Sequence, residues 1–286
     1  MKIEQVKKLT TVERFLYWIQ ERESIRLKKE RGEAKPWTND EILQMYRFCN
    51  VRRMNDKVSQ WLLKNWYEPN FDHPQMLVAC VLARHFNLPA SLEVIGFPTV
   101  WQPEKIKQQL RDMKAAGNRI FNGAYIVRGI ETTDKTEMVV DCVCQPLILS
   151  PPKIDNSSMQ QSVNALLPYW GFGSFMAGQV VADLRWGLGG KWRDKKKWAP
   201  IGPGSNRGIN RLLDKPIKTK VSQIQFNGFL RSIIVKVKDS LPRKIWGRLE
   251  AIDYQNCLCE FDKYSRTLLG EGRPKQKYAG LDYEVS

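Results

Sequence analysis

The sequence has few of the residues that build metal centres and disulfide scaffolds, and it has no long apolar run. It contains two histidines and six cysteines in 286 residues, so the common zinc ligand sets and a disulfide framework are not expected. The first residues lack the apolar stretch of a signal peptide, and the longest apolar run, 76–83, is too short to span a bilayer. These absences predict a soluble intracellular chain with no metal and no cofactor.

A nucleotide-binding P-loop is also missing. The only candidate lysine, Lys191, has Arg185 where the motif requires its first glycine and Trp192 where it requires serine or threonine. A dinucleotide-binding fold would need a strand before the glycines at 171 and 173 and a third glycine at closer spacing. A kinase or ATPase that uses these motifs is therefore disfavoured.

Positive charge and tryptophan are what the sequence has in abundance. Its 46 Lys and Arg residues against 30 Asp and Glu give a formal charge of +16, and self-repulsion of this size is offset by a polyanion such as a phosphate backbone. Ten tryptophans add aromatic faces on which unstacked bases can pack, unless most of them are core residues. Nucleic acid is the partner that this composition favours.

Helical signals dominate the chain. Capping boxes at Thr10–Glu13 and Thr38–Glu41 predict two early helices, and apolar periodicity predicts further helices over 57–66, 74–86 and 103–116 and again from Ser158. Between 119 and 149 the pattern becomes β-branched and alternating, which indicates a small β hairpin with strands near 124–128 and 138–144, or irregular chain. We therefore expect a mainly α fold with a small β hairpin insertion.

No repeat, low-complexity tract or clear linker divides the chain, so we expect a single domain over 1–286 with room for two lobes around a cleft. The tail from about residue 270 is rich in Gly, Pro and Lys and is expected at the surface. Cys142/Cys144 and Cys257/Cys259 are spaced so that a strand would place both thiols of a pair on one face. A metal clip, a redox pair and buried reduced thiols all remain open.

The segment 166–184 carries the strongest local signal. A helix breaks at Pro168, the turn Gly171-Phe-Gly173 follows, and a helix of small residues begins. Glycines at these positions let backbone amides approach an anion, and the new helix adds its positive end, which is how a helix-hairpin-helix holds a DNA phosphate. The alternative is a tight turn whose glycines serve only packing. The candidate DNA-binding residues are Trp170, Gly171, Phe172 and Gly173.

A second glycine-rich segment, 198–213, predicts an anion cradle. Loop amides, a hydroxyl and guanidinium groups could converge there on a phosphate or pyrophosphate, and the candidates are Gly202, Gly204, Ser205, Arg207, Asn210 and Arg211. In a third segment, 46–61, Arg52, Arg53 and Asp56 lie within about one helical turn. Either Asp56 clamps an arginine toward a phosphate or base edge, or the three residues form a solvated ion-pair face. Asp183 and Asp194 follow the hairpin and could face a base held beneath it.

Five separated segments, in this order, resemble the bacteriophage thymine-hypermodification proteins: 46–53, 120–125, the Gly171 hairpin, 202–211 and 258–264. This group includes the α-glutamyl or putrescinyl thymine pyrophosphorylases, the amino acid:DNA transferases and the helical domain of 5-hydroxymethyluracil DNA kinases. The resemblance extends from about Phe15 to Tyr278. The chain is also similar, more distantly, to the helix-hairpin-helix DNA glycosylases. This second resemblance implies a glycosylase-like fold.

The resemblance implies a transferase that acts on double-stranded DNA. In this family a kinase activates 5-hydroxymethyluracil as a pyrophosphate ester, and a transferase replaces the pyrophosphate with an amine such as glycine or putrescine. The base leaves the stack to be reached. The resemblance further implies a phage-encoded monomer in the cytoplasm of an infected bacterium, functionally linked to a 5-hydroxymethyluracil DNA kinase and without contact to a membrane.

The candidate roles follow this chemistry. Pyrophosphate would be held by Arg52, Arg53, Gly204, Ser205, Arg207 and Arg211. The base pocket would include Asn50, Asp56 and Asn210, and the carboxylate that takes the amine proton would be Asp183 or Asp194. Asp194 lies 21 residues after Gly173, a spacing similar to that of the catalytic aspartate in the glycosylases. Tyr169 and Trp170, however, interrupt the hairpin pattern. A base-specific glycosylase and a non-catalytic DNA-binding module are the alternatives.

Overall fold

The computed structural model describes residues 1–122, 134–274 and 277–278 of the chain. These residues form helices and turns with one isolated antiparallel bridge, between Tyr46 and Lys277, and no extended strand occurs among them. The prediction of a mainly α protein is therefore confirmed. Among the described helices, none has both the length and the apolar character that a membrane span requires.

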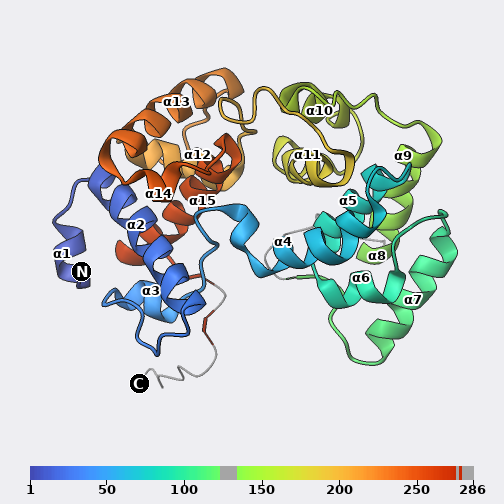
Figure 1. The fold of residues 1–286 in the computed structure, drawn as a ribbon, viewed down its shortest axis with the longest axis horizontal. Coiled ribbons are helices and arrows are strands. Elements are labelled where there is room, and N and C mark those ends of the chain that lie inside the picture. Colours follow the sequence, from blue (N-terminus) through green and yellow to red (C-terminus); the bar gives the residue numbers. More distant parts are fainter. Residues whose placement is uncertain (123–133, 275–276, 279–286) are drawn as a thin grey trace. The chain divides into compact units, whose positions relative to one another are not determined.

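The chain divides into two compact units, and unit 1 combines both ends of the sequence, Met1–Asp56 and Ile201–Ser286 (Figure 1). Its centre is α15 (Ala251–Leu268), most of whose side chains are buried, polar and charged ones among them. The helices α2, α3, α12 and α13 pack on it, and Phe15 of α2 meets Phe261 edge-on at 5.2 Å between ring centroids. The other elements of unit 1 are α1 (Ile3–Lys7), α2 (Thr11–Glu30), α3 (Glu41–Met45), η1 (Arg53–Asn55), α12 (Pro203–Leu212), α13 (Gln223–Ser240) and α14 (Arg243–Trp246).

Unit 2, Lys57–Pro200, has its own core around α5 (Met76–Phe86). All but one of the α5 side chains are buried, and α6, α11 and the π-helical η4 pack on them. The other elements are α4 (Lys57–Leu62), η2 (Leu63–Tyr67), η3 (Glu68–Asn70), α6 (Pro89–Ile95), α7 (Pro103–Ala115), α8 (Lys135–Glu137), η4 (Met138–Cys144), α9 (Gln145–Leu149), α10 (Met159–Leu166) and α11 (Ser174–Leu188).

One of the two predicted capping boxes is confirmed. The Thr10 hydroxyl accepts the Glu13 N–H at 3.3 Å, and the Glu13 carboxylate accepts the Thr10 N–H at 2.8 Å, so α2 begins as expected. The box at Thr38 is wrong, because α3 begins at Glu41 and is capped by Asp40, whose carboxylate accepts the Ile42 and Leu43 N–H groups. The Thr38 hydroxyl is engaged elsewhere, since it donates to Glu21 and accepts from the Asp40 N–H.

The predicted β hairpin is wrong in its second strand. Residues 138–144 form η4, which continues from α8, where the Asp134 carboxylate accepts the Thr136 N–H at 2.8 Å. Val139, Val140 and Val143 are fully buried at helical spacing, so their burial against α5 outweighs the β preference of their branched side chains. The first expected strand, 124–128, lies outside the described residues.

The two cysteine pairs lie on helices, so the two thiols of a pair do not share one face as the predicted metal clip or redox pair requires. Cys142/Cys144 belongs to η4 and Cys257/Cys259 to α15, and residues two apart on a helix point to different sides. Cys144 and Cys257 are buried, and burial is the main cause that raises the pKa of each thiol. In the described part of the chain, no group of three His, Cys, Asp or Glu side chains is placed to hold a metal ion.

Candidate functional site

Helix α12 organises the candidate site of unit 1. Gly202 precedes it in extended conformation and Pro203 occupies the first helical position, where its missing N–H costs nothing. Residues four apart share a helix face, so the sequence of α12 forms three pairs with different surroundings. These pairs are Gly204/Gly208, Asn206/Asn210 and Arg207/Arg211.

The glycine pair lets α12 lie close to α15. A Cβ atom on Gly204 would come within 2.2 Å of the Cys259 sulfur, and one on Gly208 within 2.2 Å of the Leu258 carbonyl oxygen. Ser205 is fully buried beside them, where its hydroxyl accepts the Gly202 N–H at 2.9 Å and the Gln255 amide N–H at 3.2 Å. Gly204 and Ser205, expected to face a pyrophosphate, thus take part in the start of α12 and its contact with α15.

Gly208→Ala should test this close packing. The new methyl group meets the α15 backbone, which cannot move away cheaply, so we expect unfolding free energy to fall by about 1–3 kcal/mol. Gly228→Ala in α13 is the matched control, because a Cβ there meets only the Arg231 guanidinium at 4.0 Å, and it should stabilise by about 0.5–1 kcal/mol. Thermal unfolding measures both, and equal midpoints for the two variants would contradict the packing role.

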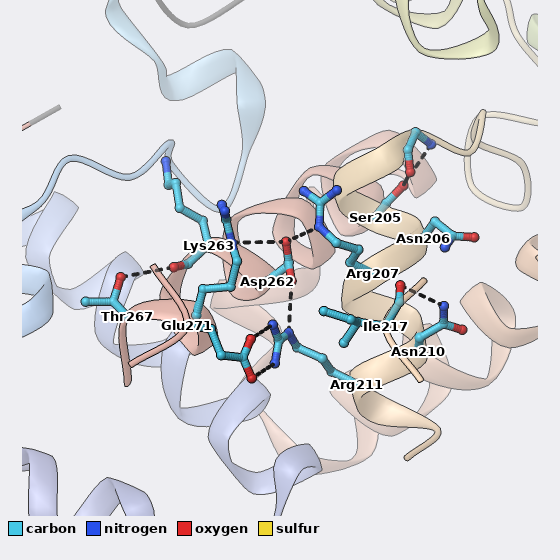
Figure 2. Close-up of polar contacts among 12 residues, drawn as sticks. Ser205, Asn206, Arg207, Asn210, Arg211, Ile217, Asp262, Lys263, Thr267 and Glu271 are labelled. Atoms are coloured by element: carbon cyan, nitrogen blue, oxygen red, sulfur yellow. Dashed lines mark hydrogen bonds and ion pairs between the residues drawn. The ribbon is translucent and has the colours of Figure 1, made fainter. Parts of the chain in front are cut away.

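The arginine pair converges on one buried carboxylate, Asp262 of α15 (Figure 2). The Arg207 Nε donates to Oδ2 at 2.7 Å and the Arg211 Nε donates to Oδ1 at 2.9 Å. Arg211 also binds Glu271 through its terminal nitrogens, and its side chain is only 6% exposed. Arg211 is therefore held on both sides as part of the protein interior.

Arg207 differs from Arg211 in that its outer edge is open. Its side chain is 34% exposed, and its two terminal nitrogens have no hydrogen-bond partner within residues 1–122, 134–274 and 277–278. The Nε–Asp262 bond fixes the plane of the guanidinium while leaving its two NH₂ groups available. A planar, pre-oriented guanidinium of this kind suits bidentate binding of phosphate oxygens.

A second polar group on α15 gathers the 47–56 segment. The Glu260 carboxylate accepts the Cys49 N–H at 2.9 Å and pairs with the Lys263 ammonium at 2.6 Å. Lys263 also donates to the Arg47 carbonyl oxygen at 3.2 Å and lies 4.7 Å from the centroid of the Phe48 ring. Two segments that lie more than 200 residues apart in the sequence are thereby joined at the surface of α15.

Asp56 lies within this group. Its Oδ1 accepts the Asn50 N–H at 2.8 Å, while its Oδ2 accepts no hydrogen bond from the part of the chain that the structure describes. Burial raises the pKa of Asp56 to about 6, partly offset by the Asn50 bond, and the Glu260 charge raises it as well. The charges of Glu260 and Asp56, after burial itself, also raise the pKa of the Cys49 thiol, which is consistent with their sharing one environment.

The remaining predicted residues of unit 1 have mixed positions. Arg53 is buried, with its backbone N–H donating to Asp253 at 2.8 Å, whereas Arg52 is half-buried. The Asn50 side chain donates to the Asn55 carbonyl oxygen and so closes the turn at η1. Asn210 is fully buried, and its amide binds the backbone of residues 217 and 219.

Both predicted catalytic aspartates belong to unit 2 and have structural partners. Asp183 of α11 is buried and pairs with both Nε and Nη2 of Arg84 on α5, and it also accepts the Tyr67 hydroxyl at 2.7 Å. Asp194 accepts the Met159 N–H at 2.8 Å, the Gln160 N–H at 2.9 Å and the Ser158 hydroxyl at 3.0 Å, so it caps α10. Asp183 therefore joins α11 to α5, and Asp194 joins the turn that follows α11 to the start of α10.

The predicted hairpin joins α10 to α11. Gly171 has φ +86°, and a Cβ there would come within 2.9 Å of Val143, so this position requires glycine. Gly173 has extended backbone and open space around it. Of the two aromatic candidates, Phe172 is buried edge-on against His85 and Trp170 is 45% exposed.

Sequence reasoning missed Glu260, Asp262 and Lys263. Their segment, Leu258–Tyr264, contributed to the family resemblance but received no role of its own. The available signal was charge on a helix whose other faces are apolar, since a charged residue in a buried helix requires a partner. Those partners come from distant segments, at 47–49 and 207–211, which the sequence alone does not pair.

Fold and site together define a helical protein that presents an oriented arginine and a buried carboxylate group. The chain belongs to the family described as the 5-hmdU DNA kinase helical domain, which it matches over residues 10–273. It is similar to the 5-hmdU DNA kinase of Bacillus phage SP10, with 25% identity over 211 residues, which cover 64% of this chain and 33% of that protein. The predicted membership in the thymine-hypermodification family is confirmed.

The chain thus spans about a third of the length of the curated relative that it matches. No solved structure matches the chain significantly.

Proposed function

We propose that the chain is a DNA base-hypermodification transferase that replaces the pyrophosphate of pyrophosphorylated 5-hydroxymethyluracil with an amine. The observation that carries the proposal is that two of the family-like segments, 46–53 and 202–211, each make polar contacts with a third, 258–264, on helix α15 of unit 1. The phage relative, a 5-hmdU DNA kinase, suggests the substrate class, a hydroxymethylated uracil in DNA. The amine is an amino acid such as glycine, or putrescine.

The leaving group is the first chemical demand. Two NH₂ groups of Arg207 point away from Asp262, and the half-buried Arg52 belongs to a segment of the same unit. Of the chain's basic and acidic residues, 29 and 18 fall in unit 1, an excess of eleven positive charges. Cations fixed before the reaction stabilise the charge that develops on departing pyrophosphate without reorganising.

The incoming amine is the second demand, because it is protonated near neutral pH. In the proposed step its nitrogen forms a bond to the exocyclic carbon, the carbon–oxygen bond breaks, and pyrophosphate leaves with that electron pair. The nitrogen must first lose a proton to a base. Asp183 and Asp194 are occupied by structural partners, so we assign this role to Asp56, whose Oδ2 is open.

Asp56→Asn should remove the acid limb of the pH–rate profile. With a pKa of about 6, Asp56 is protonated and inactive at pH 5 and ionised at pH 7, so wild-type turnover should rise about tenfold between these values. The variant should be slow, and its remaining rate should rise only with the fraction of unprotonated amine in solution, without a break near pH 6. Glu250→Gln, at the start of α15, is a control that should keep the wild-type profile, and an unchanged profile in Asp56→Asn would exclude Asp56 as the base.

DNA access is the third demand, since the base must leave the duplex. We extend the proposal to a glycosylase-like arrangement in which the amides of the Gly171–Gly173 turn bind a backbone phosphate and the exposed Trp170 packs against DNA. The partners are then double-stranded DNA carrying modified thymine, the amine, and a 5-hydroxymethyluracil DNA kinase that prepares the substrate. The setting would be the cytoplasm of an infected bacterium, with the chain acting as a monomer.

The test incubates the protein with pyrophosphorylated hydroxymethyluracil DNA and candidate amines, followed by digestion to nucleosides and mass spectrometry. A transferase gives a new aminomethyl nucleoside and one pyrophosphate for each, with the glycosidic bond intact. Abasic sites would instead identify a glycosylase. DNA binding with neither product, for every amine tried, would identify a binding module and overturn the transferase.

A further inference from the structure

The loop between α12 and α13 carries three unpaired cations. Lys215, Lys218 and Lys220 are all exposed, and none of them forms an ion pair with a carboxylate of the described chain. The Lys215 ammonium lies 5.3 Å from the centroid of the Phe229 ring. Asp214 is the single acidic residue of the loop, so the segment 214–222 has a net positive charge.

Helix α12 fixes the backbone of this loop. The Asn206 side chain donates to the Thr219 carbonyl oxygen at 2.8 Å and accepts the Val221 N–H at 3.1 Å. One turn further along, the Asn210 side chain donates to the same Thr219 oxygen at 2.7 Å and to the Ile217 oxygen at 3.3 Å, a contact drawn in Figure 2. Two asparagines thus fix the backbone that carries the lysines, which lowers the backbone entropy lost when a partner binds them.

An apolar residue follows the cations at the start of α13. Ile224 is 86% exposed, the most exposed of the large apolar side chains in the described residues. It lies in the first turn of a helix whose N-terminus is already capped by Ser222, which accepts the Gln225 N–H. The position of Ile224 therefore has no folding explanation within unit 1, and it lies four residues after Lys220.

We infer that the segment Lys215–Ile224 is a duplex DNA-binding surface of unit 1, in which the three ammonium groups bind backbone phosphates and Ile224 packs against the minor-groove sugars. Architectural proteins that bind the minor groove combine cations on phosphates with apolar side chains inserted in that groove. A lipid surface fits less well, because a single exposed isoleucine offers too little apolar area for insertion. The inference rests on the proposed function only in that DNA is the partner.

The experiment measures binding of the full chain to a fluorescent, unmodified duplex by anisotropy between 50 and 300 mM salt. Lys215→Gln, Lys218→Gln and Lys220→Gln are combined, and the matched control combines Lys2→Gln, Lys7→Gln and Lys8→Gln, exposed lysines near the N-terminus with the same change in charge. Each phosphate contact contributes about 0.9 to the slope of log K against log salt, so the loop variant should lose about 2.7 of that slope. Its affinity at low salt should fall about 10- to 100-fold.

Ile224→Ser separates the apolar contact from the charges. It should lower affinity several-fold at every salt concentration and leave the slope unchanged, because no counterion is released by an apolar contact. Equal slopes for the loop variant and the N-terminal control would overturn the inference. Binding to vesicles of anionic lipid with no binding to the duplex would overturn it as well.

No modified base or amine is present in this assay, so its outcome does not depend on turnover. A loop variant with the predicted loss of slope, together with no new nucleoside in the mass-spectrometric test, would keep the surface and reject the transferase. If the loop variant forms the new nucleoside on duplex DNA at the wild-type rate, the transferase is kept and the binding surface is rejected.

Discussion

Arg207→Ala is expected to reduce turnover by about 100- to 1000-fold while the thermal unfolding midpoint stays nearly constant, because removing one preorganised donor to a developing anion costs this much. The stability should be retained for a structural reason. Asp262 loses one partner but keeps Arg211 at 2.9 Å and Arg266 at 3.6 Å, and the Arg207 side chain is partly exposed. Single-turnover kinetics at saturating DNA and amine measure the first effect, and calorimetry measures the second.

Two further variants make the Arg207 result specific. Arg207→Lys keeps the charge but loses both the Nε bond to Asp262 and the two parallel NH₂ groups, so we expect it to recover only a small part of the rate. Arg211→Ala, in contrast, should mainly lower the free energy of unfolding, because Asp262 and Glu271 lose a buried common partner. A folded Arg207→Ala protein with wild-type turnover would remove the anion site from α12.

How far the sequence predicts the site depends on whether a feature is local. The glycine-rich segment before a helix, with Arg207 in its early turns, was correctly expected, since capping and proline placement act within a few residues. That Arg207 is open while Arg211 is enclosed was not predictable, because the difference is made by Asp262 and Glu271, which lie more than 50 residues further along the chain. The same holds for Gly204, whose role depends on the approach of Cys259.

The errors in the fold have a related cause. Val139 and Val140 have β-branched side chains in an alternating context, which predicts a strand, but tertiary burial at i, i+3 and i+4 decides the structure. The prediction for the two cysteine pairs is wrong for the same reason, because a spacing of two residues places both thiols on one face only in a strand. At Thr38 a neighbouring residue, Asp40, offered a better cap while Glu21 engaged the threonine hydroxyl.

Asp183→Ala should produce the largest loss of stability in the chain. Arg84 and Asp183 are 4% and 1% exposed, so removal of the carboxylate leaves a guanidinium without its counter-charge in the core of unit 2. The expected cost is about 3–5 kcal/mol, which corresponds to a fall of roughly 10 °C in Tm for a protein of this size. Tyr67→Phe is the milder control, since it removes only the hydroxyl that donates to Asp183 and should cost about 1 kcal/mol.

A double variant decides whether Asp183 acts through structure or through chemistry. Replacing the pair with apolar residues of similar volume, Arg84→Met with Asp183→Leu, removes both buried charges and should restore much of the lost stability, because such pairs contribute little net free energy. If Asp183 only holds α5 against α11, the double variant should also regain turnover as it regains its fold. A stable double variant without any turnover would instead return the role of proton acceptor to Asp183 and take it from Asp56.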